Sequence, residues 1–372
     1  MKLIKDFIKM ILRMISGDLE VFIVDFLYLR RLNRKPPELM WKSARPGPYA
    51  RLDAGGACLN EKLYVFGGFG HGSTIYSIVN VFDSKKGKWV DEFDMPAKMA
   101  QSHQGLVSDG KRYIYEVSGQ LGDQCRPPTA DCFVLDVETK TWSTLPPLAE
   151  ARYAVTLQLW RGRLHAIGGS KTDRNTPSTD HWSIAVECGK SPENQWRKEP
   201  SIPRGGPHRA SAVVDDRLYV FGGQEGDYIA IPGDANYTCT GDLTNEVVFA
   251  DTYMLPYGEK KWQRMADMPI KVSHTEFSIV IIGPYVVILG GMDNKDPDTK
   301  RVTVINRIQV YDTRNDTWDI VGHLPYGIKS TVAAYVDGWL YMTTGQRDHD
   351  IDDRSAGNYD RRVWRAKFSL KL

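Results

Sequence analysis

Short apolar segments recur along the chain, and each of them ends at a pair of small residues. Leu63–Phe66, Leu218–Phe221 and Leu340–Thr343 are three of these segments. Short apolar runs that end at turn-forming residues predict β-strands rather than helices. The small-residue pairs are Gly67-Gly68, Ser118-Gly119, Gly168-Gly169, Gly222-Gly223, Gly290-Gly291 and Thr344-Gly345.

Aromatic residues follow each small-residue pair in a fixed order. A third-strand aromatic comes first and a fourth-strand tryptophan comes next, and the pairs repeat at intervals close to the kelch period of about 50 residues. The third-strand aromatics are Phe82, Phe133, Trp182, Tyr253, Tyr311 and Trp364, and the fourth-strand tryptophans are Trp89, Trp142, Trp196, Trp262 and Trp318. The pattern predicts an all-β fold, a six-bladed kelch-type β-propeller, in which glycine permits close approach near the axis and aromatics fill the wider wedges.

The sixth repeat has no tryptophan strand of its own, because the chain ends shortly after Trp364. Leu39–Lys42 contains Trp41 and precedes the first complete repeat. We therefore expect an N-terminal strand to complete the sixth blade and to cover the sheet edge that an open array would expose. This divides the chain into a leader, residues 1–35, and a propeller, residues 36–372.

The leader carries apolar and basic residues at helical spacing. Ile4, Ile8 and Ile15 lie among Lys5 and Lys9, which predicts a short amphipathic helix before the propeller. The apolar run that follows is interrupted by acidic residues, so it matches neither a spanning helix nor a signal peptide. Three interpretations stay open: a helix packed on the propeller, a membrane-surface anchor, and the remainder of a longer leader.

Charge and cysteine content exclude several classes of protein. The net charge is +2, with a basic excess in residues 1–35, so the propeller has no electrostatic footprint for nucleic acid. Five cysteines without a CxxC pair do not indicate a zinc site or a disulfide framework. Cys125 and Cys239 lie in comparable loops of two repeats and are a candidate disulfide in an oxidising compartment.

A binding surface is predicted where the segments between blades and the loops after the small-residue pairs emerge around the channel mouth. The side chains expected there are long and polar, which suits an oxygen-rich ligand or an acidic peptide. The segments between blades contribute Arg51, Asp53, His103, Gln104, Arg152, Tyr153, His208, Arg209, His274, Glu276 and Lys329. The loops contribute His71, Gln120, Lys171, Gln224, Glu225, Asp293, Gln346 and Arg347.

Catalytic alternatives use the same rim. Four histidines, His71, His103, His208 and His274, come from different blades, but histidines on separate loops do not by themselves indicate a metal site, and we predict neither metal nor cofactor. Isomerase-like chemistry on a sugar or small metabolite would need an acid and a base, for which Glu276 with His274 or Arg209 is the candidate set. No nucleophile elbow, P-loop, dinucleotide or zincin motif is present.

The sequence resembles the plant kelch repeat-containing proteins of the galactose oxidase/kelch superfamily over roughly residues 36–372. The resemblance rests on runs such as Leu159–His165, Pro203–Ala210, Gly222–Asp227 and Gly345–Asp348, and on the loop Gly119–Arg126. It implies a propeller in the Golgi lumen held by an N-terminal anchor.

Two sequons, at Asn236 and Asn315, agree with a lumenal, glycosylated propeller. The favoured hypothesis is a secretory-pathway binding protein that recognises a glycan, a peptide or a protein partner at the rim, with possible attachment to a membrane through residues 1–35. An enzyme using the same rim and a cytosolic adaptor for protein partners are the alternatives. Fold alone does not choose among them.

Overall fold

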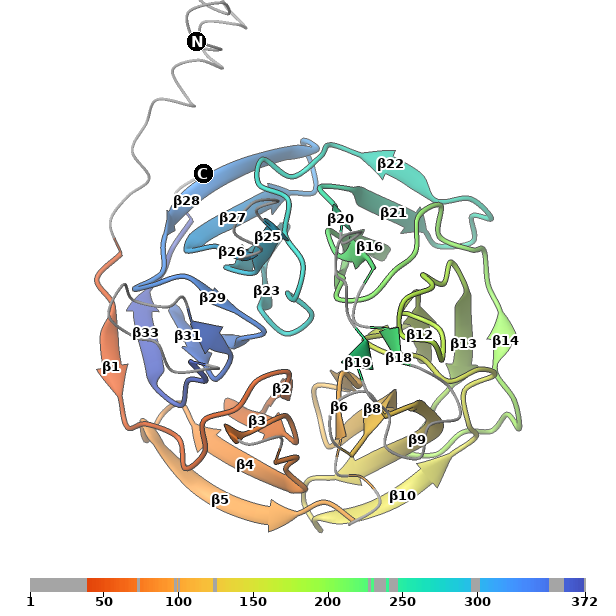
Figure 1. Ribbon diagram of the computed structural model, residues 1–372, viewed down its shortest axis with the longest axis horizontal. Coiled ribbons are helices and arrows are strands. Elements are labelled where there is room, and N and C mark those ends of the chain that lie inside the picture. Colours follow the sequence, from red (N-terminus) through yellow and green to blue (C-terminus); the bar gives the residue numbers. More distant parts are fainter. Residues whose placement is uncertain are drawn as a thin grey trace, which may run out of the picture. The chain divides into compact units, whose positions relative to one another are not determined.

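Six antiparallel sheets surround a common axis, each with its first strand innermost (Figure 1). The computed structural model describes residues 39–71, 74–96, 99, 101–122, 126–226, 229–230, 239–240, 247–295, 302–347 and 358–370. No α-helix occurs in this described part of the chain. The prediction of an all-β, six-bladed kelch-type propeller is confirmed.

Blade 1 comprises β2 (Gly55–Leu59), β3 (Lys62–Phe66), β4 (Ile78–Asp83) and β5 (Lys88–Asp94). Blade 2 comprises β6 (Gln101–Ser102), β7 (Gly105–Ser108), β8 (Tyr113–Leu121), β9 (Pro128–Asp136) and β10 (Thr141–Leu145). Blade 3 comprises β11 (Thr156–Trp160), β12 (Arg163–Ile167), β13 (His181–Ala185) and β14 (Arg197–Lys198).

Blade 4 comprises β15 (Ala210–Val214), β16 (Arg217–Phe221), β21 (Thr252–Pro256) and β22 (Gln263–Met265). Blade 5 comprises β23 (Ile279–Ile282), β24 (Tyr285–Leu289), β27 (Arg307–Asp312) and β28 (Thr317–His323). Blade 6 comprises β30 (Val332–Val336), β31 (Trp339–Thr343), β33 (Val363–Lys367) and β1 (Lys42–Ala44).

Four short ladders stand outside the blades, in the segments next to the small-residue pairs. They are β17 (Gln224–Glu225) with β20 (Val247–Val248), β18 (Ile229–Ala230) with β19 (Cys239–Thr240), β25 (Met292–Lys295) with β26 (Val302–Val304), and β29 (Ile328–Lys329) with β32 (Gln346–Arg347). We call the side of the ring that carries these segments the loop face. The opposite side, which carries the turns from first to second and from third to fourth strands, is the turn face.

The N-terminal strand closes the ring as the sequence predicts. β1 pairs antiparallel with β33, in a register that places Ser43 opposite Trp364. Trp41, directly before β1, donates its indole N–H to the His323 carbonyl of blade 5 at 2.7 Å. Blade 6 therefore takes its outer strand from one end of the chain and its inner three strands from the other.

The same indole contact recurs around the ring. In each case a tryptophan at the outer strand donates to a backbone carbonyl at the end of the outer strand of the preceding blade, which links neighbouring blades at their periphery. The contacts are Trp89 to Arg45, Trp196 to Pro146, Trp262 to Pro200 and Trp318 to Ala266, at 2.8–3.2 Å. Trp142 is the exception, because its buried indole nitrogen has no acceptor among the described residues.

The small-residue pairs form a second ring of contacts, near the axis. The second residue of every pair donates its backbone N–H to the carbonyl of a residue that leads into the next blade, for example Gly68 to Gln101 at 3.0 Å. The other five are Gly119 to Arg152, Gly169 to Gly206, Gly223 to Val272, Gly291 to Ile328 and, across the closure, Gly345 to Arg51, at 2.8–3.1 Å. A Cβ on Gly67 would lie 2.2 Å from the Gln101 oxygen, so this approach requires glycine.

Apolar cores fill the wedges between blades. Six clusters of buried apolar side chains occur among the described residues, and each joins side chains from two neighbouring blades. The third-strand aromatics belong to these cores: Phe82 is 1% exposed and Tyr311 is fully buried. This confirms the prediction that aromatics occupy the wider part of each wedge.

The predicted leader, residues 1–35, lies outside the described residues. The structure groups Leu39–Leu372 into one compact unit. Within the described residues, no helix has the length and apolar character needed to cross a membrane. The helical leader and its attachment to a membrane therefore stay predictions.

We predict that ring closure sets the solubility of the fold. Deleting residues 36–44 removes β1 and leaves β33 as an open edge strand, which should aggregate. Trp41→Phe keeps the strand but removes one hydrogen bond, and should lower the free energy of unfolding by about 1 kcal/mol. Light scattering and thermal melting measure both effects; a deletion variant that is soluble with an unchanged Tm would contradict the closure.

A pair of buried histidines lies within blade 3, on β12 and β13. His165 Nδ1 lies 2.8 Å from His181 Nε2, and His181 Nδ1 lies 3.2 Å from the Pro200 carbonyl. Burial lowers the pKa of His165 to about 3 and that of His181 to about 4, and for His165 the neighbouring His181 adds to the effect. Both rings are therefore neutral in the folded protein at neutral pH.

We expect this pair to make the propeller acid-sensitive. Below pH 6.5 the unfolded chain protonates these imidazoles while the folded chain does not, so stability falls between pH 6.5 and about 4, by roughly 3 kcal/mol for each imidazole. Melting curves from pH 7 to 4 should show a smaller decline for His165→Gln than for the wild type. The exposed His71→Gln serves as the control, and equal declines in all three proteins would rule out the pair as the cause.

Candidate functional site

Each blade begins with one residue in the left-handed backbone conformation. These residues come two positions after the carbonyl that accepts the N–H of the small-residue pair, so the chain turns toward the axis there. They are Asp53, His103, Ala154, His208, His274 and Ser330, with φ between 44° and 60°. Because none is glycine, the conformation costs energy that the interblade hydrogen bonds must offset.

Asp53, His103 and Ser330 meet although they belong to three different blades. His103 Nε2 lies 3.4 Å from Asp53 Oδ2, and the Ser330 hydroxyl donates to Asp53 Oδ1 at 2.6 Å. Burial alone would raise the pKa of Asp53, but the charges of His103, His208 and Lys329 and the Ser330 hydrogen bond outweigh it and hold that pKa below its usual value. Asp53 is therefore a buried carboxylate.

His208, His274 and Glu276 form a second group beside the first. His208 Nδ1 lies 2.5 Å from Glu276 Oε1. The His208 and His274 rings stack with centroids 3.7 Å apart, and the His103 ring meets His208 edge-on at 5.3 Å. Burial, with the nearby charges of His208 and Lys329, lowers the pKa of His274 well below its usual value.

We call these six residues the axial polar cluster: Asp53, His103, His208, His274, Glu276 and Ser330. Their side chains come from five blades and contact each other, which places them at the axis. The three histidines are 2–8% exposed. The cluster thus fills the channel with hydrogen-bonded side chains instead of leaving them solvated at its rim.

The predicted rim arginines do not join the cluster. Arg51, Arg152 and Arg209 are each 1% exposed, although we expected them on an accessible rim. Arg51 donates to the Gly67 carbonyl at 3.0 Å and also bonds Asn80. Arg152 donates to Asp180 Oδ2 at 2.8 Å. These guanidiniums lie inside the blades, where carbonyls, carboxylates and aromatic faces compensate their burial.

Arg209, one of the candidate catalytic residues, has its described contacts outside the axial polar cluster. Its Nη1 donates to the Arg204 carbonyl at 2.8 Å, and its guanidinium lies over the Phe249 and Tyr253 rings, at 5.5 and 5.6 Å from their centroids. Burial lowers its pKa to about 10. The described hydrogen bond of Glu276 goes to His208, whose ring stacks on His274, so of the two predicted partners of Glu276 it is His274 that lies in the same cluster.

Other predicted rim residues are also internal. Gln104, Gln120, Tyr153 and Gln224 are at most 1% exposed. Gln120 accepts from Arg174 Nη1 at 2.9 Å, and Gln224 donates to the Gly226 carbonyl at 2.9 Å. The Gln120 and Gln224 side chains thus hold loops of the loop face in place by hydrogen bonds from the protein interior.

A smaller group remains open to solvent on the loop face. The β29–β32 ladder places Lys329 opposite Gln346 and Ile328 opposite Arg347. This brings together residues from both predicted sources, a segment between blades and a loop after a small-residue pair. The other predicted residues with exposed or half-exposed side chains are His71, Lys171, Glu225 and Asp293.

Two hollows are lined mostly by residues outside the predicted rim. The first is the part of the channel between the axial polar cluster and the turn face, with a volume of 310 Å³. Its walls come from the inner strands β2, β7, β11, β23 and β30, and Glu276 is the one charged residue that lines it. Inner-strand residues were not considered as site residues because their apolar pattern alone identifies them as core.

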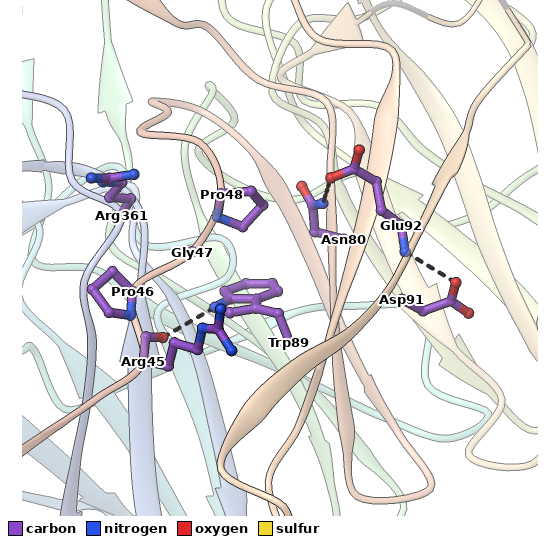
Figure 2. Close-up of a pocket in the computed structure, with 9 residues that line it drawn as sticks. All are labelled: Arg45, Pro46, Gly47, Pro48, Asn80, Trp89, Asp91, Glu92 and Arg361. Carbon is purple, nitrogen blue, oxygen red and sulfur yellow. Dashed lines mark hydrogen bonds between the residues drawn. The ribbon is translucent and has the colours of Figure 1, made fainter.

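The second hollow is a groove of 560 Å³ at the seam between blades 6 and 1 (Figure 2). Arg45 and Arg361 lie on one side, and Asp91 and Glu92 lie on the other, with Trp89 between them. The Trp89 indole donates to the Arg45 carbonyl at 3.2 Å. Ring closure creates this groove, so no local sequence signal marks it.

The remaining candidate sites concern a metal ion, the predicted disulfide and the two sequons. Among them, no group of three or more histidine, cysteine or acidic side chains is arranged to hold a metal ion. Cys125, the side chain of Cys239 and the sequon at Asn236 lie outside the described residues. Asn315 is exposed in the turn between β27 and β28, where its amide donates to Asp312 Oδ2 at 2.9 Å.

Comparison with known proteins agrees with the repeats. The kelch motif matches residues 50–96, 151–203 and 274–325. A kelch repeat-containing protein of Arabidopsis thaliana is 45% identical over 334 residues, which cover 90% of this chain and 77% of the relative. The kelch-like protein terF of Aspergillus terreus is 20% identical over 304 residues, covering 80% of this chain and 61% of that protein.

Among solved structures, YjhT superimposes with a TM-score of 0.63 at 15% identity, covering 86% of this chain and 95% of YjhT. At this identity the likeness shows the fold alone. Fold, repeats and axial geometry define a closed kelch β-propeller. The chain belongs to the family of kelch repeat-containing proteins.

Proposed function

We propose that this protein is a binding propeller of the secretory pathway that recognises a protein partner. Lys329 and Arg347, on the loop face, bind acidic side chains of that partner. The observation that carries this proposal is the β29–β32 ladder, which pairs Lys329 with Gln346 on one of its faces and Arg347 with Ile328 on the other. Positive charges held on a rigid ladder favour carboxylates of a partner.

The surroundings of the two cations differ: Arg347 pairs with Asp360, whereas no described carboxylate hydrogen-bonds to the Lys329 ammonium. The one described hydrogen bond of the Lys329 ammonium goes to the Met292 sulfur at 3.5 Å, a weak acceptor. The Arg347 guanidinium lies 5.5 Å from the Tyr326 ring centroid and 3.8 Å from Asp360, and 24% of its side chain is exposed. The ring fixes the position of the guanidinium while part of it stays open to a partner.

The buried residues behind the ladder make this surface rigid. The Ile305 carbonyl accepts from the Ile328 N–H at 3.2 Å, and the Ile328 carbonyl accepts from the Gly291 N–H at 2.8 Å. Ser330 follows Lys329 directly and is fixed by Asp53. A preorganised surface loses little conformational entropy on binding, which raises affinity.

Charge reversal tests this surface. The double variant Lys329→Glu/Arg347→Glu should reduce partner recovery in quantitative affinity purification by about tenfold, because two attractive contacts become repulsive. Lys260→Glu/Lys261→Glu, in the exposed turn between β21 and β22 on the turn face, is the matched control. If the same partners are recovered in equal amounts with all three proteins, the loop-face ladder is not the binding surface.

The compartment is a separate element of the proposal, supported by the exposed Asn315 sequon. Expressed in a eukaryotic cell, the protein should show a mobility shift with endoglycosidase that is lost in Asn236→Gln/Asn315→Gln. The physical reason is that oligosaccharide transfer occurs only in the lumen, on accessible sequons. An unshifted wild type would count against lumenal residence and favour a cytosolic adaptor.

A further inference from the structure

We propose that the hollow between the axial polar cluster and the turn face binds a small molecule with a protonated amine on an apolar body. This site is separate from the loop-face ladder of the proposed function. It is called the channel pocket below. Its volume of 310 Å³ lies at the lower end of the range for small-molecule sites.

Apolar side chains and polar groups both contribute to the wall of the channel pocket. Leu106, Phe277, Ile279 and Val280 line the channel pocket together with small residues of the inner strands, such as Ala57 and Ala333. Displacing water from such a wall favours an apolar ligand by roughly 25 cal/mol for each Å² of apolar surface that is buried. The wall therefore selects for a hydrocarbon or aromatic body.

Glu276 is the one charged residue that lines the channel pocket. Its Oε1 is 2.5 Å from His208 Nδ1, and its Oε2 has no hydrogen-bond partner among the described residues. The side chain is 14% exposed, and it lines the channel pocket. A carboxylate oxygen that faces a low-dielectric hollow attracts a cationic donor more strongly than a surface carboxylate does.

The geometry favours an ammonium over the other cations. A guanidinium binds best when both carboxylate oxygens accept from it, but His208 already occupies Oε1. A metal ion would need further ligands, and the other polar groups of the lining, such as Ser108 and Gln158, are neutral. A primary ammonium can donate one hydrogen bond to Oε2 and turn its apolar stem along the wall.

The pocket is preformed by the same contacts that build the ring. His208, which orients Glu276, is held by its stack with His274, at 3.7 Å between centroids. The Phe277 carbonyl accepts from the Ala333 N–H of blade 6 at 2.8 Å, which fixes the wall beside the carboxylate. Ligand binding therefore needs no rearrangement of the inner strands.

Cyclohexylmethylamine and cyclohexylmethanol are a matched pair of probes, since they share their apolar body and differ in charge. Calorimetric titration of the full-length protein at pH 7 should detect the amine, with at least tenfold weaker binding of the alcohol. Glu276→Gln keeps the size of the side chain and an acceptor for His208. It should weaken amine binding about tenfold or more, since it removes a charged hydrogen bond.

Two further variants of this protein serve as controls for amine binding. Glu92→Gln, in the seam groove, should bind the amine like the wild type. Lys329→Glu/Arg347→Glu should also leave amine binding unchanged, so failure of the loop-face proposal would not affect this one. No binding of the amine, equal affinity for amine and alcohol, or unchanged amine affinity in a folded Glu276→Gln would each overturn the channel pocket.

Discussion

Six backbone hydrogen bonds from the small-residue pairs to the following blades set the geometry of this propeller. In four of the six, the accepting carbonyl, such as that of Gln101, lies against a glycine whose missing Cβ permits the approach; Ser118 and Thr344 occupy that position in the other two. The contact from Gly345 to Arg51 belongs to the same series and joins the last blade to the first. Because the contacts form a closed ring, loss of the β1–β33 pairing would disturb the axis as well as the edge.

The same hydrogen bonds determine which side chains reach the axis. Two residues after each accepting carbonyl the chain enters the left-handed region, and that residue points inward. The backbone feature repeats in all six blades, whereas the side chain does not: blade 3 has Ala154 and blade 2 has His103. A repeated backbone thus carries a varied set of side chains, which gives this channel its particular chemistry.

The axial polar cluster divides the molecule into two surfaces with different properties. Toward the loop face, Lys329 and Arg347 offer positive charge on a short ladder. Toward the turn face, Glu276 offers negative charge in a hollow whose wall is partly apolar. His208 and His274 lie between the two, with His274 held neutral by burial, so the charges on each side act on different ligands.

The sequence by itself determined the repeat number, the blade aromatics and the closing strand, because Gly pairs and tryptophans impose local requirements that recur. It also placed Asp53, His103, His208, His274 and Glu276 on one predicted rim, together with other polar residues, but it did not name Ser330, which completes the axial polar cluster. Only the tertiary structure showed that Arg51, Arg152 and Arg209 are buried inside blades, since a polar side chain in a loop and one in an interblade core look alike in sequence. The pairing of Glu276 with His208 and the hollow beneath it arise where strands distant in sequence meet at the axis, which no local pattern encodes.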